Sequence, residues 1–403
     1  MHAGPSPKSK SALFKKKQKV CFLFNHDQTH QVAHSLPIAM AMARDKRVDV
    51  TIATTNDQIT SYVSEVLGPS ACEVTCFQLD LNSAISRGVT AFLDGLVPAR
   101  KLLMYRDNLG FFRQFDALVV SEKSSLLLKK RYGLDGLKLI HTRHGAGDRA
   151  IGFNKESSLF DLILVSGPKI ARRLQKEAEV PAQKIRIAGY SKFDLFGNTR
   201  LRLPFANPAL PTVVYNPHVS PRLSSWPAMG ERVLRELTGS NRYNVIFAPH
   251  VMLFARKFVV TVSPPAISLT RRPSREISQH ANLLIDLGSD ASTNMAYTNA
   301  ADIYVGDVSS QVYEFIRKPR PCLHLDAQGV NWQSDPDYSH WRLGPVAGRD
   351  QNVLAAVDEA VASHADYLPV QKAMLKDTFS MTEELASDRS ARAIIEFLDA
   401  KSH

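Results

Sequence analysis

The sequence predicts an α/β protein built from two consecutive doubly wound lobes with a cleft between them. Strand-like and helix-like segments alternate from residue 19 onward, which is the pattern of parallel βαβ units. The chain of 403 residues is long enough for two domains, and its 44% hydrophobic content is sufficient for two separate cores. Three prolines between 201 and 211 interrupt the alternation, so we expect an interdomain linker there.

The expected boundaries follow from this alternation and its interruption. We expect a basic, disordered tail at 1–18 and a first Rossmann-like lobe at 19–200, followed by the linker at 201–211. A second Rossmann-like lobe is expected at 212–378, and a C-terminal helical segment at 379–403. Ligands of such open sheets bind outside the carboxyl ends of the strands, so residues that follow strands are the candidates for a site.

Each element is predicted from short apolar runs (strands) or from apolar residues at helical spacing (helices). The strands expected in the first lobe are 19–25, 48–54, 73–79, 117–120, 137–141, 161–165 and 185–188, and its helices are 34–44, 59–67, most of 83–115, and 169–179. The strands expected in the second lobe are 212–215, 244–248, 282–286, 302–305 and 321–325. Its helices are 230–237, 295–300, 308–317 and 352–363, and two more at 368–377 and 382–400 end the chain.

The N-terminal tail is strongly basic. Six lysines and no acidic residue occur among the first 19 residues, and the whole chain has a net charge of +11. Attraction to the anionic inner face of a membrane, at about 1 kcal/mol per basic residue, and a solvated tail without function both fit this pattern. The tail lacks interleaved aromatic residues, so we expect no nucleic-acid partner.

Several features favour a cytoplasmic protein, held at most peripherally on the inner face of the cell membrane. No run of apolar residues approaches the roughly 20 that a membrane-spanning helix requires. The N-terminus shows no secretory cleavage pattern. The four cysteines show no convincing metal-type spacing, which favours buried, reduced thiols.

The most informative segment is 302–319. An apolar strand ends at Asp307, and Ser309 and Ser310 open an amphipathic helix that carries Glu314 one turn deeper. Free backbone N–H groups at a helix start stabilise a phosphate, and serine hydroxyls add donors without bulk. Glu314 would be placed to accept hydrogen bonds from a ribose. The alternative is that Asp307 or Ser309 only caps the helix.

This segment resembles the Asp-Tyr-Ser-Ser…Phe…Lys-Pro motif of the CDP-glycerol glycerophosphotransferases, which build teichoic-acid and capsule-like polymers. Four further segments resemble that family in the same order, at 142–153, 160–167, 187–194 and 249–250. The resemblance implies a GT-B fold with an acceptor-side first lobe and a nucleotide-donor second lobe. It also implies a CDP-activated donor and a polymer, glycan or lipid-linked acceptor. Val308 departs from the family motif, which has an aromatic residue there.

The resemblance also implies roles for individual residues. His144, in a glycine-flanked loop after a strand, would be the general base, because imidazole accepts a hydroxyl proton near neutral pH. His250 would stabilise phosphate charge or the leaving group. The residues expected on the nucleotide and phosphate side are Asp307, Ser309, Ser310, Glu314, Gly189, His218 and Arg222. The family shows a different segment around His218, which leaves its role open, and Arg222 would supply the missing charge.

The residues expected on the acceptor side are His30, Gly145, Arg149 and Glu122. Glu122 follows a strand in the segment 121–125, where a capped helix start is an equal alternative. Zinc binding by the histidines at 26, 30 and 34 is disfavoured, because their loop is expected to line the acceptor side of the cleft. No Asp-x-Asp pair follows a strand. We therefore expect neither a metal nor another cofactor.

Two alternatives stay open. The first is a GT-B glycosyltransferase, or an enzyme similar to the UDP-sugar 2-epimerases, that uses a nucleotide sugar. Such epimerases carry a His-x-Glu-Ala-Gly loop, and the segment 143–147 lacks that glutamate. The second is a non-catalytic relative that binds a nucleotide or an anionic lipid.

Overall fold

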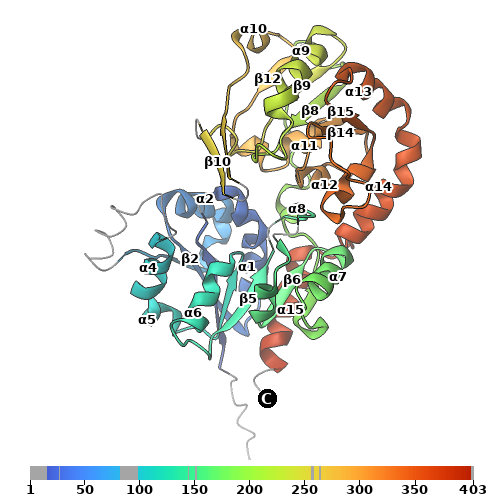
Figure 1. Cartoon of the computed structure of the whole chain (residues 1–403). Coiled ribbons are helices and arrows are strands. Elements are labelled where there is room, and N and C mark those ends of the chain that lie inside the picture. The colour runs from blue at the N-terminus through green and yellow to red at the C-terminus, as the bar shows by residue number, and fades with distance from the viewer. Residues whose placement is uncertain are drawn as a thin grey trace, which may run out of the picture.

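The computed structural model describes residues 16–26, 28–81, 99–143, 145–149, 152–255, 258–262 and 265–400. These residues form two lobes, one above the other in Figure 1, each built on a parallel sheet. The strand order is β3-β2-β1-β4-β5-β6-β7 in the first lobe and β12-β9-β8-β13-β14-β15 in the second. The prediction of two doubly wound α/β lobes is therefore confirmed.

The first lobe contains every strand that the sequence predicts for it. Its strands are β1 (Gln18–Phe24), β2 (Val48–Thr54), β3 (Thr75–Gln78), β4 (Ala117–Val120), β5 (Lys138–Thr142), β6 (Leu162–Val165) and β7 (Ile185–Ile187). Its helices are η1 (Thr29–His34), α1 (Leu36–Ala43), α2 (Asp57–Leu67), η2 (Gly68–Glu73), α4 (Ala99–Asp107), α5 (Leu109–Phe112), η3 (Lys123–Leu126), α6 (Leu127–Lys130), η5 (Lys155–Leu159), α7 (Pro168–Glu177), η6 (Ala182–Lys184) and α8 (Lys192–Phe196). Residues 83–98 of the long predicted helical stretch lie outside the described residues.

The second lobe carries more strands than predicted. Its parallel strands are β8 (Thr212–Asn216), β9 (Asn244–Phe247), β12 (Leu283–Ile285), β13 (Ile303–Gly306), β14 (Cys322–Asp326) and β15 (Val346–Gly348), and a hairpin pairs β10 (Phe258–Val262) with β11 (Pro265–Leu269). Its helices are η7 (Trp226–Gly230), α9 (Glu231–Gly239), α10 (Arg275–Ser278), η8 (Asp290–Ser292), α11 (Ala296–Ala300), α12 (Gln311–Phe315), η9 (Pro336–Leu343), α13 (Val353–Ala362) and α14 (His364–Thr378), and α15 (Ala386–Ala400) ends the described chain. β15 escaped prediction because three residues are too few to show a period.

Three helix starts differ from the prediction by three or four residues, and one of them is that of α15, which begins at Ala386 rather than at 382. α12 begins at Gln311 rather than at 308, because Val308–Ser310 form the turn that leaves β13. α14 begins at His364 rather than at 368, and Pro369 lies inside it. Proline is favoured at the first position of a helix, which fits the predicted start at 368. The helix in fact begins one turn before this proline.

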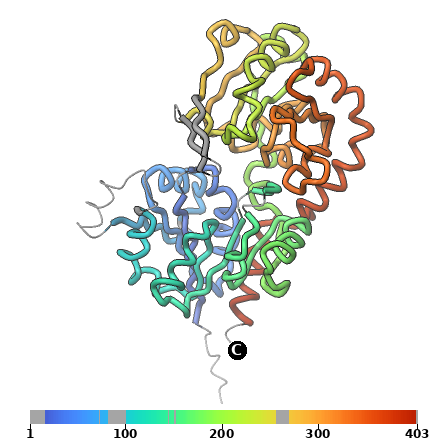
Figure 2. Tube along the Cα trace, viewed as in Figure 1, coloured from blue at the N-terminus to red at the C-terminus, as the bar shows by residue number. Residues whose placement is uncertain are grey.

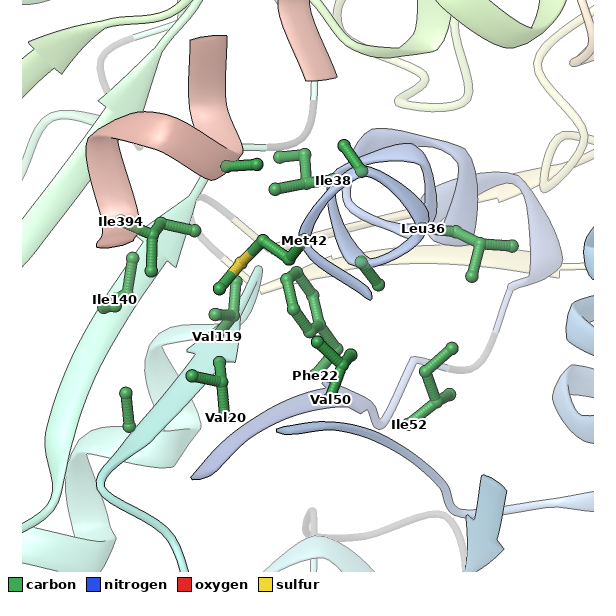
Figure 3. Packing of buried hydrophobic residues seen from close by; sticks show 14 of the residues in the cluster. Val20, Phe22, Leu36, Ile38, Met42, Val50, Ile52, Val119, Ile140 and Ile394 are labelled. Carbon is green, nitrogen blue, oxygen red and sulfur yellow. The ribbon is translucent and has the colours of Figure 1, made fainter. Parts of the chain in front are cut away.

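The strands are apolar runs because both faces of each sheet are covered. All four residues of β4 are at most 1% exposed, as expected for a parallel sheet with helices on both sides. Figure 3 shows one of these cores, where Phe22 and Val119 of the sheet meet Met42 of α1. Ile394 of the C-terminal helix belongs to the same cluster. The end of the chain therefore crosses back to the first lobe, as Figure 2 shows, and its apolar side chains complete the core there.

Candidate active site

A cavity of about 800 Å³ lies between the lobes and is lined by residues from both. Nine of the residues singled out in the sequence lie in its wall: His30, Glu122, Gly145 and Arg149 from the first lobe, and His218, His250, Ser309, Ser310 and Glu314 from the second. Residues from both halves of the expected site thus meet at one cavity. His144, the expected general base, lies outside the described residues, although Arg143 and Gly145 on either side of it line the cavity.

His218 and His250 follow the neighbouring strands β8 and β9 and are held in the same way. The Nδ1 atom of His218 accepts a hydrogen bond from the backbone N–H of Ser220 (2.9 Å), and that of His250 accepts one from Met252 (3.2 Å). The two rings lie 5.8 Å apart between centroids. A neutral ring whose Nδ1 accepts a hydrogen bond carries its proton on Nε2.

Electrostatics favours that neutral form in both rings. Burial, together with the charges of His250, Arg149 and His340, lowers the pKa of His218 to about 3. Burial also lowers the pKa of His250. At neutral pH both rings are therefore uncharged, and each has an Nε2–H left to donate. The pair forms a double hydrogen-bond donor in the wall of the cavity.

Asp307 lies beneath the cavity rather than in its wall. Its side chain is buried and accepts hydrogen bonds from the backbone N–H of His218 (2.9 Å) and from both the N–H (2.6 Å) and Oγ (2.9 Å) of Ser225. Burial raises the pKa of Asp307 to about 6, although these hydrogen bonds act in the opposite direction. The carboxylate neither caps α12 nor faces the cavity. It anchors the segment that carries His218 to the end of β13.

Ser309 and Ser310 form the turn between β13 and α12. Ser309 is buried, whereas Ser310 is exposed and its hydroxyl makes no capping hydrogen bond to α12. α12 has only five residues, so its dipole is weaker than the sequence suggested. The donors available to the cavity at this point are therefore the hydroxyl of Ser310 and the backbone N–H groups of the turn that precedes α12.

Glu314 is committed to an ion pair across the lobes. Its carboxylate accepts hydrogen bonds from Lys192 Nζ at 2.7 and 2.9 Å and from the Tyr190 hydroxyl at 2.8 Å. Lys192 and Glu314 are both buried. A ribose would have to share this carboxylate with Lys192. The sequence had suggested neither Lys192 nor Tyr190 as a partner of Glu314. Both residues lie in the segment 187–194, which resembles a motif of the family.

Two residues expected at the nucleotide side lie elsewhere. Arg222 is exposed and does not line the cavity. Gly189 has a positive φ of 92°, and Arg389 and Ala386 occupy the space that a Cβ there would need. Gly189 therefore lets the start of α15 approach β7. The cationic side chains that do line the cavity are those of Lys123, Arg143, Arg149 and Lys192.

Glu122 is an ionised carboxylate in the first-lobe wall. Lys101 Nζ donates to both of its oxygens (2.8 and 2.9 Å), and His26 Nδ1 lies 3.3 Å from Oε1. Burial raises the pKa of Glu122, but the hydrogen bonds with His26 and Lys101 outweigh this and bring it to about 2. Such a carboxylate is a strong hydrogen-bond acceptor and a weak base. His26 therefore contacts Glu122. Among the described residues, no group of His, Cys, Asp or Glu is arranged to hold a metal ion.

Asp148 is a site residue that the sequence did not reveal. It is buried at the lobe interface, where Oδ1 accepts from Lys169 Nζ (2.7 Å) and Oδ2 from the Tyr313 hydroxyl (2.5 Å). His340 Nδ1 lies 3.2 Å from Oδ2. Burial raises the pKa of Asp148, but the hydrogen bond from His340 and the charge of Lys169 bring it to about 2. Only its place in a loop after β5 could have suggested a role.

Two Rossmann-type lobes with a shared cleft at their strand ends define the GT-B fold, as the sequence predicted. No protein-family model matches this sequence, and no curated protein matches it. Solved structures do match: the wall teichoic acid polymerase TagF is 12% identical with a TM-score of 0.62, over 96% of this chain and 91% of TagF. A variant of TagF soaked with CDPG matches with a TM-score of 0.61 and 14% identity, over 96% of this chain and 90% of the variant.

Nucleotide-sugar epimerases share the fold as well. The S. aureus MnaA–UDP structure is 12% identical with a TM-score of 0.60, over 96% of this chain and 98% of MnaA. UDP-GlcNAc 2-epimerase from Neisseria meningitidis, bound to UDP-GlcNAc, is 11% identical with a TM-score of 0.58, over 95% of this chain and 100% of the epimerase. The expected likeness to a teichoic-acid polymerase is thus confirmed for the fold. Across the described residues, no helix combines the length and apolarity needed to cross a bilayer.

Proposed function

We propose that this chain is a transferase that moves a glycerol-phosphate-type group from a CDP-activated donor to a polymer, glycan or lipid-linked acceptor. The observation that carries the proposal is the pair of neutral histidines, His218 and His250, beside the turn at Ser310. Three uncharged donors at one wall suit a pyrophosphate, and the opposite wall offers Glu122 to hydroxyl groups. We further propose 19–200 as the acceptor-side domain, 201–211 as the linker and 212–378 as the donor domain.

The donor-side residues would act by stabilising charge. An acceptor hydroxyl attacks the phosphorus that carries the glycerol, the bond from that phosphorus to the bridging pyrophosphate oxygen breaks, and CMP leaves. Charge grows on that bridging oxygen and on the equatorial oxygens, where the Nε2–H groups of His218 and His250 donate. Since both rings already carry the Nε2 proton, neither takes the proton from the acceptor.

The acceptor proton therefore needs another base, and we propose His144 for it. The support for this proposal is that its neighbours Arg143 and Gly145 line the cavity. Glu122, with its low pKa, would hold a second hydroxyl of the acceptor rather than take its proton. His30 and Arg149 complete this wall, Arg149 as a cation for an anionic group of either substrate.

A nucleotide panel tests the proposal. Thermal unfolding is followed with CMP, CDP, UMP and UDP, and we expect stabilisation by the cytidine nucleotides alone. A ligand at 100 times its Kd stabilises by about 2.7 kcal/mol. For a chain of this length that corresponds to a rise in Tm of about 3 °C, from an unfolding entropy of about 2.1 cal/mol/K per residue.

The second candidate is an enzyme that uses a UDP-sugar, and the UDP-bound structures of the same fold favour it. A preference for UDP in the panel would select this candidate and refute the first. Binding of a nucleotide without transfer to any glycan or lipid-linked acceptor would instead favour the non-catalytic relative.

We also propose that the lysine-rich N-terminus holds the protein at an anionic membrane surface in the cytoplasm. Residues 1–15 lie outside the described residues, and the six lysines are the support for this proposal. Removal of residues 1–17 should abolish binding to vesicles that contain anionic lipid. Equal binding of the full-length and shortened proteins would refute it.

A further inference from the structure

A buried bridge joins the acceptor-side loop to the donor-side turn. The loop 145–149 belongs to the first lobe, and the turn 307–310 belongs to the second. Gly147 lies so close to this turn that a Cβ there would be 3.2 Å from Ser310 Cβ. Asp148 of the loop and the backbone oxygen of Asp307 are both bound by one side chain, His340 of η9.

Both ring nitrogens of His340 have a partner. Nδ1 lies 3.2 Å from Oδ2 of Asp148, and Nε2 lies 3.1 Å from the backbone oxygen of Asp307. A carbonyl oxygen and a carboxylate are both hydrogen-bond acceptors, so each ring nitrogen faces an acceptor from a different lobe. The exposed fraction of His340 is 3%, and its ring is held between these two oxygens.

The bridge is supported from both lobes. Lys169 of α7 holds the other oxygen of Asp148, and the Tyr313 hydroxyl of α12 shares Oδ2 with His340. Trp341 Nε1 donates to the same backbone oxygen of Asp307 at 2.9 Å. The neighbouring His324 has no hydrogen-bond partner among the described residues, and its ring centroid lies 5.7 Å from that of His340.

We propose that His340 is a positioning residue, whose ring keeps the loop 145–149 at the correct distance from Ser310. This inference rests on the proposed function, because that loop follows His144 and that turn faces the donor. His340 borders the cavity, but both of its ring nitrogens already contact Asp148 and Asp307, so neither is left for a phosphate. It acts through Asp148 and Asp307, and it sets the spacing between the two halves of the cleft.

The test separates the two arms of the bridge. His340→Asn keeps a donor near the position of Nδ1, and His340→Gln keeps one near Nε2. Hydrogen exchange of the backbone amides in 145–149 is measured in the ligand-free protein. We expect exchange at least about 10-fold faster in both variants, because each loses one of the two contacts that hold the ring between the loop and the turn. The control is His324→Phe, which changes a buried histidine of the same neighbourhood that lacks such a bond.

A second readout distinguishes positioning from simple packing. Turnover should fall by about 100-fold in both variants, since small displacements of reacting groups have effects of that size. The Kd of the stabilising nucleotide should stay unchanged. The proposal is overturned if exchange in 145–149 is the same in the variants and the wild type, or if His324→Phe accelerates it equally. The exchange measurement requires no activity, so it remains decisive if the proposed transfer reaction fails.

Discussion

Replacing Lys192 by methionine tests the ion pair that links the two lobes. Lys192 and Glu314 are 5% and 7% exposed, and their side chains meet at 2.7 and 2.9 Å. Methionine fills a similar volume but leaves the carboxylate of Glu314 with only the Tyr190 hydroxyl. Removing one partner of a buried ion pair costs about 3–5 kcal/mol, because the other charge remains buried without compensation.

The magnitude can be expressed as a melting temperature. With an unfolding entropy of about 2.1 cal/mol/K per residue, a loss of 4 kcal/mol lowers the Tm of this chain by about 5 °C. The double variant Lys192→Met/Glu314→Gln removes both charges and should recover most of the loss. Urea unfolding gives the free energies for a double-mutant cycle. If the single variant lost less than about 1 kcal/mol, or if the two substitutions were additive, the pair would not carry the interlobe contact.

Three further predictions concern the cleft. His218→Ala and His250→Ala should each weaken nucleotide binding by about 10- to 100-fold, because each removes one hydrogen bond to a charged group. The control His280→Ala, outside the cleft, should leave binding unchanged. Calorimetric titration measures the Kd of the nucleotide in each variant. His144→Ala should abolish transfer and leave nucleotide binding intact; surviving transfer would reject His144 as the base. The lowered pKa of Asp148 adds about 2 kcal/mol to the free energy of unfolding. This contribution is present above pH 3.8 and is lost as the pH falls towards 2. Asp148→Asn should therefore flatten the acid-unfolding curve between these two pH values.

The fold was predictable because its signals are local. Both faces of a parallel sheet are buried, so strands such as β4 and β6 are continuous apolar runs that stand out from the segments between them. Topology then places the ends of parallel strands at one edge. For that reason His218 and His250, each just after a strand, could be expected near Ser309 and Ser310 before their positions were known.

The chemistry of individual side chains was less predictable. Asp307 has the sequence context of a phosphate ligand or a helix cap, yet its carboxylate binds Ser225, 82 residues away. Arg222 is near His218 in sequence but is exposed and does not line the cavity. The tautomers of His218 and His250 depend on backbone N–H groups two residues further on, which only the turn geometry brings to Nδ1.

By itself, the sequence determined the two α/β lobes, the strand-end position of the histidine pair and the position of Ser309 and Ser310 between a strand and a helix. The tertiary structure alone decided which charges are neutralised and by which partner. Glu314 meets Lys192 across 122 residues, and Asp148 meets His340 across 192. The physical reason is that periodicity and turn chemistry act over a few neighbouring residues, whereas a buried charge requires a partner in space. No local pattern identifies such a partner, because it is supplied by the packing of one lobe against the other.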